Sequence, residues 1–261
     1  MSDSNSQDNN IGQESATTFD PATFDEYAEL YDSFSLQPYR TQLETPTIKF
    51  HLGKLSGKRI MDFGCGPGFY ARWLIDNGAK EVFGYDISKG MLDHAIYQEK
   101  KDGKGITFLS HLDESLNNTF DIVLSIYVIP YINSLEDLST LFMSFASLLK
   151  PGGKLITLPL HPDFNTDPLY YLPFGFSLTE TEARADGSKV GLHLHKPPYD
   201  IDLQTYYWSA HTLESTLAAA GFNNILWRPL IWAENTSAED TAFLQPYQQQ
   251  PHAAIIECTR G

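Results

Sequence analysis

The stretch RIMDFGCGPGFY, residues 59–70, constrains the fold more than any other part of the chain. It reads as a buried strand that ends near Asp62, then Gly64, Gly66 and Gly68, then a helix. Glycines permit positive φ and let a ligand approach the backbone, and the first turn of the next helix presents free N–H groups. Nucleotide-like ligands bind at such strand–loop–helix junctions. The stretch therefore predicts an α/β fold with a ligand at this loop.

A second acid follows the next predicted strand, residues 81–85. Asp86 lies 22 residues beyond Gly64, close to the ~20 expected for a carboxylate that binds ribose hydroxyls. The glycine spacing differs from the Gly-x-Gly-x-x-Gly of dinucleotide sites, because position 69 is Phe. Asp62 also precedes the loop, and a carboxylate there disfavours an anionic pyrophosphate. The pattern therefore indicates a nucleotide-like ligand that is not a dinucleotide.

Further motifs follow in order along the chain. DFGCGPG at 62–68, Asp86, FDIV at 120–123 and LKPGG at 149–153 resemble the ordered motifs of class I S-adenosylmethionine-dependent methyltransferases, over roughly residues 55–160. The resemblance implies S-adenosyl-L-methionine as cofactor and a small molecule as methyl acceptor, methylated on oxygen, nitrogen or carbon. The ammonium and sulfonium of that cofactor also suit a pocket edged by acids.

The resemblance implies a set of cofactor-binding residues. Asp86 would accept the ribose hydroxyls, Ile87 would pack on the adenine, and Asp62 would organise the loop and the surroundings of the amino group. Where similar proteins usually carry an Asp at the adenine edge this chain has Leu112. His111, Asp113 or backbone alone would then contact that edge. The full predicted set is Tyr31, Tyr39, Asp62, Gly64, Cys65, Gly66, Gly68, Asp86, Ile87, His111, Leu112, Asp113 and Ser125.

Catalytic residues are harder to identify from the sequence than cofactor-binding residues, because displacement at an activated sulfonium needs chiefly alignment of the reacting atoms. Many relatives have a His where Pro130 stands. His161, just beyond the predicted fifth strand, is the first candidate for a base that takes a proton from an O–H or N–H nucleophile. Tyr131 is the second candidate catalytic residue, and Tyr127 and Tyr131 either line the pocket or pack in the core.

Metal and disulfide sites are not expected. His193 and His195 share one face of a predicted strand and with a carboxylate could hold a metal, but such pairs are more often solvated. The two cysteines, Cys65 and Cys258, allow no disulfide framework.

The hydrophobic pattern and the Gly and Pro turn signals divide the chain into five segments. These are a disordered polar tail, a helical lid, a Rossmann-like core, an antiparallel insertion over the acceptor site and the C-terminal part of the core. Alternating strands and helices predict a doubly wound α/β sheet, mostly parallel with an antiparallel last strand. Within this scheme we expect a helix at 43–52 broken at Pro46, and a long polar loop at 232–251. The five segments are 1–18, 19–54, 55–159, 160–208 and 209–261.

The net charge of −15, without any Lys/Arg cluster, argues against a nucleic-acid acceptor. No apolar run is long enough to span a membrane, and the N-terminus lacks a signal pattern, so we expect a cytoplasmic protein. We expect it to be a monomer or a homodimer. Three alternatives stay open: an enzyme of this fold that uses the cofactor for another reaction, a nicotinamide-dependent oxidoreductase, and a non-catalytic scaffold.

Overall fold

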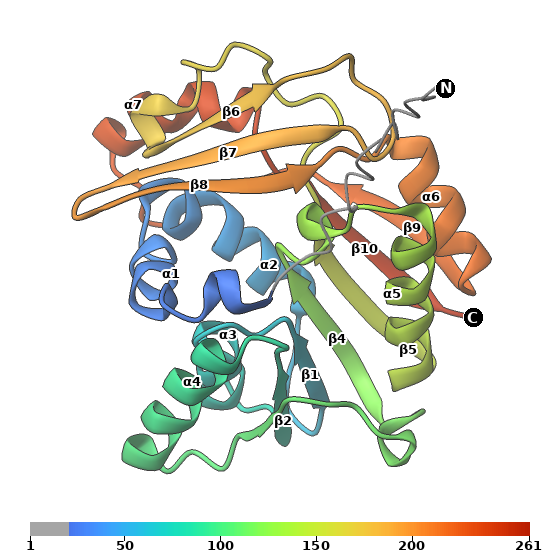
Figure 1. Cartoon of the computed structure of the whole chain (residues 1–261). Coiled ribbons are helices and arrows are strands. Elements are labelled where there is room, and N and C mark those ends of the chain that lie inside the picture. The colour runs from blue at the N-terminus through green and yellow to red at the C-terminus, as the bar shows by residue number, and fades with distance from the viewer. Residues whose placement is uncertain (1–20) are drawn as a thin grey trace, which may run out of the picture.

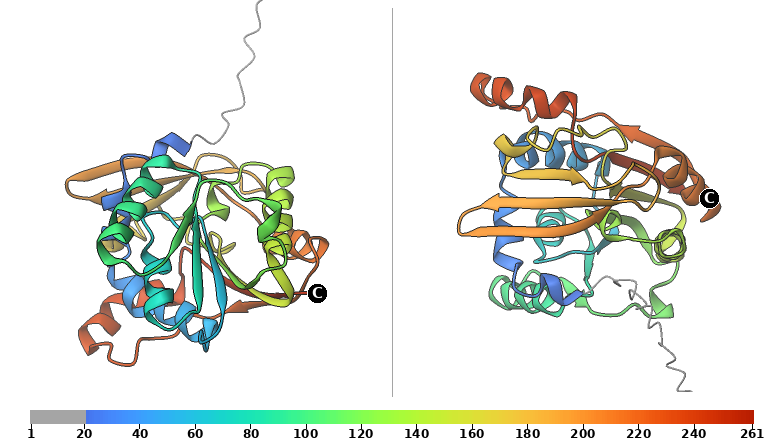
Figure 2. Two further views of the ribbon diagram at one scale, coloured as in Figure 1. Left: turned by 90° about the horizontal axis from the view of Figure 1, so that it is seen from below. Right: turned by 45° about the horizontal axis from the view of Figure 1, so that its top comes forward.

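A computed structural model describes residues 21–261, so the tail predicted at 1–18 lies outside the described residues. In this part of the chain a large sheet carries helices on both faces, and a separate three-stranded sheet lies across one end, over the first helices (Figure 1). Figure 2 shows the two sheets from below and with the top of the molecule tilted forward.

Seven strands form the large sheet in residues 21–261. Six run parallel, and β10 lies antiparallel between β5 and β9. The predicted fold class, a mostly parallel doubly wound sheet with an antiparallel last strand, is therefore confirmed. In spatial order the strands are β3 (Thr107–Leu109), β2 (Glu81–Tyr85), β1 (Arg59–Phe63), β4 (Phe120–Ile126), β5 (Leu149–Leu158), β10 (Ile255–Arg260) and β9 (Phe222–Arg228).

Strand β1 shows how the sequence builds the two faces of the sheet. Its side chains alternate, so that Ile60 packs into one apolar cluster while Met61 and Phe63 pack into another. Strands buried on both faces in this way are typical of parallel sheets. The Ile60 face is covered by α2 (Thr45–Leu52) and α3 (Phe69–Asp76), and the Met61 face by α5 (Leu135–Leu148) and α6 (Ala210–Ala219).

The order of the strands places the ligand crevice. The sheet grows from β1 through β2 to β3 on one side and from β4 through β5 on the other. Ligands of open α/β sheets bind beyond the carboxyl ends of the strands at such a switch point. The loop after β1, which leads into α3, and the segment after β4 therefore face one another. Helix α4 (Lys89–Asp102) follows β2 at the same edge.

The N-terminal segment and the insertion form one apolar layer. The insertion folds as the predicted antiparallel sheet, with β6 (Phe176–Glu180), β7 (Lys189–Lys196) and β8 (Tyr199–Tyr206). It packs on α1 (Ala28–Phe34) and its flanks. The buried residues that the two segments share in one cluster include Phe24, Leu30, Phe34, Leu178, Val190 and Leu203.

The predicted break at Pro46 is wrong. A π-helical segment, Arg40–Glu44, leads directly into α2, and Pro46 lies in the first turn of α2. Proline has no N–H, so the Gln42 carbonyl four residues earlier loses its helical donor. The N–H of Ala233 supplies the missing hydrogen bond at 2.8 Å. The chain therefore stays helical through this point, because a distant segment satisfies the carbonyl.

The polar loop predicted at 232–251 is also wrong, since most of it is helix α7 (Ala238–Gln249). The Ser237 hydroxyl caps the helix by accepting from the Asp240 N–H at 3.0 Å. Leu244 and Tyr247 are its buried residues. Two apolar anchors are too sparse to give a 3.6-residue periodicity. No helix in residues 21–261 has the length and apolar character that crossing a membrane requires.

Candidate active site

A cavity of about 570 Å³ lies at the carboxyl ends of β1, β2 and β4. Its walls come from the glycine loop after β1, from the segments that follow β2 and β4, from α5 and from the N-terminal lid. Predicted site residues meet here from four parts of the chain. Those that line the cavity are Tyr31, Asp62, Gly64, Cys65, Gly66, Asp86, Ile87 and Tyr131.

The glycine loop is shaped by its neighbours. The N–H groups of Gly64 and Cys65 both donate to the Tyr85 carbonyl, at 2.7 and 2.9 Å. Gly64 has a φ of +71°, and a Cβ there would lie 2.2 Å from Cγ2 of Val128. Gly68, with φ +87°, begins α3 without a side-chain cap. The loop therefore needs glycine for both conformation and space, and it leaves the first N–H groups of α3 without a side-chain cap.

Asp86 fixes the edge of the cavity. Its Oδ2 accepts from the Gly66 N–H at 2.7 Å and its Oδ1 from the Ser88 N–H at 2.9 Å. Burial raises the pKa of Asp86, and these N–H groups oppose that rise. Each carboxylate oxygen keeps a further lone pair, so Asp86 can still accept hydrogen bonds from hydroxyl groups of a ligand.

Asp62 is an unusual buried acid. Its residue is 2% exposed, and Oδ2 has no hydrogen-bond partner within residues 21–261. Burial raises its pKa to about 7, opposed by the Ala71 N–H and reinforced by the nearby charge of Asp86. An unpaired buried carboxylate is costly unless a cation or donor compensates it. Asp62 therefore fits a ligand that brings positive charge to this end of the cavity.

Aromatic side chains close the cavity on the lid side. The hydroxyls of Tyr31 and Tyr131 lie 3.1 Å apart, and Phe24 packs edge-on against both rings. Burial raises the pKa of Tyr131 to about 12 and holds that of Tyr31 well above its usual value. Both phenols are therefore neutral at physiological pH, and they present hydroxyl groups within an otherwise apolar wall.

Two aspartates fasten the lid to the core. Asp25 accepts from the hydroxyl of Ser88 and the N–H of Gly90, both at 2.8 Å. Asp32 accepts from Arg72 of α3 at 3.2 Å and lies 3.1 Å from Nε2 of His94 in α4. These contacts hold the segment of Tyr31 over the ligand loops.

A buried polar network lies at the base of the lid, and sequence analysis missed it. Arg40 lines the cavity and forms an ion pair with Glu44, with Nε 3.5 Å from Oε2. Burial works against the Arg40 charge, but Tyr127, Tyr70 and Glu44 keep its pKa raised. Both charges come from the π-helical segment, and such segments are frequent at functional sites.

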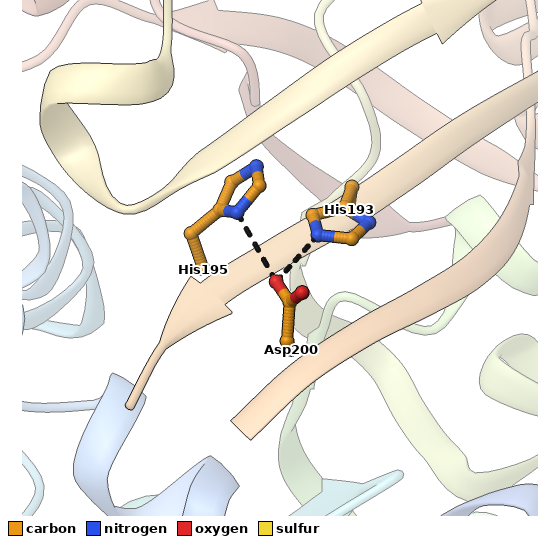
Figure 3. A group of neighbouring side chains, drawn as sticks. All are labelled: His193, His195 and Asp200. Atoms are coloured by element: carbon orange, nitrogen blue, oxygen red, sulfur yellow. Dashed lines mark hydrogen bonds and ion pairs between the residues drawn. The ribbon is translucent and has the colours of Figure 1, made fainter. Parts of the chain in front are cut away.

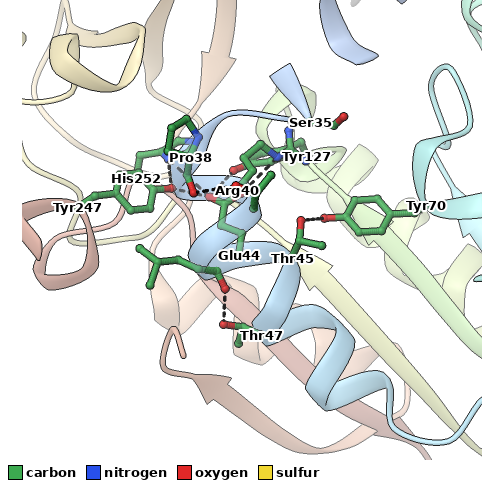
Figure 4. Close-up of polar contacts among 12 residues, drawn as sticks. Ser35, Pro38, Arg40, Glu44, Thr45, Thr47, Tyr70, Tyr127, Tyr247 and His252 are labelled. Atoms are coloured by element: carbon green, nitrogen blue, oxygen red, sulfur yellow. Dashed lines mark hydrogen bonds and ion pairs between the residues drawn. The ribbon is translucent and has the colours of Figure 1, made fainter. Parts of the chain in front are cut away.

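Tyr127 links this network to β4 (Figure 4). Its backbone is left-handed, with φ +61°, and its hydroxyl donates to Oε1 of Glu44 at 2.7 Å. The ring lies between the Arg40 guanidinium, 4.8 Å from its centroid, and the His252 ring, stacked at 5.5 Å. Strained backbone is concentrated at functional sites.

Glu44 also accepts from the Tyr247 hydroxyl (Figure 4). The same hydroxyl lies 2.7 Å from Nδ1 of His252. Since a phenol has one proton, Tyr247 must accept from Nδ1–H of His252. Burial lowers the pKa of His252 to about 3, so its ring is neutral.

Several predicted site residues lie away from the cavity. Tyr39 packs its ring against Tyr247, 4.7 Å between centroids. Ser125 is fully buried in β4. Gly68, at the start of α3, is not a lining residue, although its neighbours Pro67 and Phe69 are.

The predicted adenine-edge residues are also separate from the cavity walls. Asp113 uses its carboxylate to accept from the Ser115 N–H at 2.7 Å. Leu112 packs against the apolar core, and His111 is exposed. His111, Leu112 and Asp113 follow β3, whereas the lining residues follow β1, β2 and β4 or belong to the lid and α5.

His161 lies in a separate depression beside Trp227, Leu230 and Pro251. The ring Nδ1 of His161 accepts a hydrogen bond from the Asp163 N–H at 3.0 Å. The backbone N–H of His161 donates to the His252 carbonyl at 2.8 Å. The structure therefore does not bring His161 to the cavity.

A family model described as a methyltransferase domain matches residues 39–226, which is more than half of the chain. The chain belongs to this methyltransferase family. S-adenosyl-L-methionine is the cofactor of the class I methyltransferases that its motifs resemble, and the recognition made from those motifs is confirmed.

The chain matches relatives whose names assign methyl transfer to different atoms. It is 34% identical to the ubiquinone biosynthesis O-methyltransferase of Alkalilimnicola ehrlichii over 125 residues, 46% of this chain and 47% of that protein. It is 26% identical to the N-demethylindolmycin N-methyltransferase of Streptomyces griseus over 170 residues, 64% of this chain and 70% of that protein. The chain spans 47% to 59% of three curated relatives that it matches.

The fold of this methyltransferase is similar to that of an S-adenosylmethionine-dependent methyltransferase from Mesorhizobium loti, with a TM-score of 0.58 and 21% identity. The alignment covers 87% of this chain and all of that one, 100%. The residues present also fit the cofactor, because an unpartnered buried carboxylate oxygen of Asp62 and a glycine cradle meet at one end of the cavity.

Proposed function

We propose that this methyltransferase transfers a methyl group from S-adenosyl-L-methionine to an O–H or N–H group of a small molecule in the cytoplasm. The observation that carries the proposal is the pair of acids at the cavity edge, Asp62 with its unpartnered Oδ2 and Asp86 held by two backbone N–H groups. Two carboxylates beside a glycine loop suit a ligand that combines a cationic amino acid part with ribose hydroxyls.

Each part of the cofactor has a proposed partner. Asp86 accepts the ribose hydroxyls, and Ile87, which lines the cavity and is 49% exposed, packs on the adenine. Asp62 faces the positive charge of the methionine part. Arg40, at the lid side of the cavity, is the candidate for its carboxylate, because a guanidinium pairs with carboxylates in bidentate geometry.

The acceptor shares the cavity with the cofactor. About 570 Å³ lies within the range of small-molecule sites. Phe24, Tyr31 and Tyr131 give it a largely aromatic wall with two hydroxyls. An aromatic or other flat apolar acceptor with one polar group is the class that these walls favour.

The bound cofactor supplies an electrophilic methyl group on sulfur. The chain's own residues have to hold the acceptor in line with that methyl at about 3–3.5 Å and keep water out. Tyr31 and Tyr131 would orient the acceptor's oxygen or nitrogen by hydrogen bonds. Their raised pKa values keep both phenols neutral, so neither supplies a phenolate that could take a proton from the acceptor.

The base role predicted for His161 has no support from the cavity, because His161 lies in another depression. We therefore expect His161→Ala to keep its turnover. A loss of turnover with unchanged cofactor affinity would restore the sequence-based hypothesis.

Two experiments test the proposal. Calorimetric titration of the full chain should show binding of S-adenosyl-L-methionine and of S-adenosylhomocysteine but not of NADH. Incubation with phenols and with secondary amines should then release S-adenosylhomocysteine with one of the two classes. Binding of NADH alone would favour the oxidoreductase, and turnover of an acceptor without S-adenosylhomocysteine would favour a different reaction on this fold.

A further inference from the structure

A cluster of histidines and aspartates lies on the insertion, outside the cavity. His193 and His195 alternate along β7, and Asp200 and Asp202 alternate along β8. The register pairs His193 with Asp202 and His195 with Asp200. Directly paired residues share a face of an antiparallel sheet, so all four side chains lie on one surface.

The other face of the same two strands is anchored. Leu194 and Leu203 are buried in the cluster shared with the lid, and Leu192 and Ile201 pack against it. The backbone positions under the four polar residues are therefore fixed by packing, which favours a rigid arrangement of potential ligands.

Three of the polar side chains converge. Figure 3 shows His193 and His195, both on β7, directed at Asp200 on the neighbouring strand β8. Nε2 of His193 lies 2.7 Å from Oδ1 of Asp200, and Nδ1 of His195 lies 3.2 Å from the same oxygen. One ligand atom from each residue lies within 4.8 Å of the others. Ligands of a tetrahedral zinc ion are about 3.4 Å apart, so small rotations suffice to admit one.

Asp202 supplies an independent indication. Its Oδ1 contacts Nδ1 of His193 at 2.5 Å, on the opposite side of the ring from Asp200. A histidine that binds a metal almost always donates its other N–H to a carboxylate, which fixes the tautomer and the ring orientation. His193 has that arrangement, with Nε2 left toward His195 and Asp200.

We propose that His193, His195 and Asp200 form a surface site for a zinc ion, with Asp202 orienting His193. Two imidazoles and one carboxylate are a zinc ligand set that leaves a fourth position for water. Mg²⁺ prefers oxygen ligands and is not expected to bind here. The site sits beside Lys196, whose Nζ donates to the carbonyl of Ser33 at the end of α1 at 2.8 Å. Zinc would therefore join β7 to β8 at the end that contacts the lid.

Calorimetric titration of the tag-free, chelator-treated full chain with ZnCl₂ tests this site. We expect one zinc per chain and an increase in Tm on binding. His193→Ala should lose binding, and Asp202→Asn should weaken it at least tenfold. His211→Ala, a histidine on α6 far from the β7–β8 turn, is the matched control and should bind like the parent chain.

The visible absorption of bound Co²⁺ gives a second measurement that does not depend on enzyme activity, and circular dichroism checks that each variant is folded. His195→Gln repeats the test if His193→Ala fails to fold. The proposal is overturned if ZnCl₂ does not bind, or if the folded His193 or His195 variant binds it as the parent chain does.

Discussion

The hydroxyl of Tyr127 donates a 2.7 Å hydrogen bond to Glu44, across 83 positions of sequence. The bond joins the segment after β4 to the π-helical turn of the lid. Because Arg40 pairs with the same carboxylate, the wall of the cavity depends on a buried ion pair as well as on apolar packing.

Removal of the Glu44 charge should destabilise the fold. In Glu44→Gln the Arg40 charge remains without its carboxylate, and breaking a buried pair costs about 3–5 kcal/mol. Urea unfolding measures this change in the free energy of unfolding. The control is Glu29→Gln on the exposed side of α1, which should stay within about 0.5 kcal/mol of the parent. Equal effects of the two changes would contradict a structural role of the pair.

A methyl group at Gly64 should distort the cofactor loop. In Gly64→Ala the new Cβ would lie 2.2 Å from Cγ2 of Val128, in a backbone with φ +71°. Gly57→Ala is the matched control, because Gly57 has φ +80° and nothing within 4 Å of the added atom. Gly64→Ala should therefore lose more stability in urea and also lose cofactor affinity.

The double variant Gly64→Ala/Val128→Ala separates the clash from the backbone strain. Val128→Ala removes the clashing methyl, so part of the stability lost in Gly64→Ala should return. Strictly additive losses in the double variant would show that the contact with Val128 does not matter.

Asp62 should lower the stability of the cofactor-free protein as the pH rises, and it acts against His252, whose pKa burial lowers to about 3. Asp62 has an ordinary pKa of 3.8 in the unfolded chain and about 7 in the folded one. The folded state therefore holds this proton more tightly, so the stability that it contributes is complete below about pH 4 and is lost as the pH rises through about 7. Asp86, whose pKa is also raised, acts in the same direction.

Urea unfolding between about pH 5 and about pH 8 measures this slope. Asp62→Asn should shift the slope toward higher stability with rising pH, because an amide does not titrate, while Asp102→Asn on the surface should leave the slope unchanged. Cofactor affinity should show the opposite trend and increase toward pH 7, as the carboxylate that faces the cation ionises. A slope unchanged in Asp62→Asn would exclude Asp62 as its source.

Asp86→Ala should weaken binding of S-adenosyl-L-methionine at least tenfold, about 1.4 kcal/mol. The change removes the proposed acceptor of the ribose hydroxyls and the partner of the Gly66 N–H. Calorimetry gives the dissociation constant, and Asp102→Asn again serves as control. An unchanged dissociation constant would remove the ribose assignment.

Sequence analysis predicted the sheet and the ligand loop because both depend on local pattern. Ile60 and Met61 before Asp62 and Phe63 after it are apolar, and glycines at 64, 66 and 68 have few uses other than positive φ. The same reasoning missed Arg40 and Glu44, which look like the solvated face of a surface helix. Their burial follows from Tyr127 and Tyr247, which come from distant parts of the chain.

The position of His161 illustrates a second limit of local pattern. Residues just beyond a parallel strand usually face the ligand crevice. Here Leu160 pairs with Ala253, and the His161 N–H donates to the carbonyl of His252. This pairing with the segment before β10 carries His161 away from the cavity, and it depends on residues 90 positions later that no local signal identifies.

The apolar cluster shared by the lid and the insertion bears on the engineering of acceptor range. In the described part of the chain, residues 160–208 line none of the cavity, whereas they support the lid residues that do. A chimera that receives the insertion of another methyltransferase would therefore change the residues that pack against the lid, while the residues that line the pocket would stay the same. Such a transplant should give a folded protein only when residues 21–52 move with it, because the two segments share one apolar cluster.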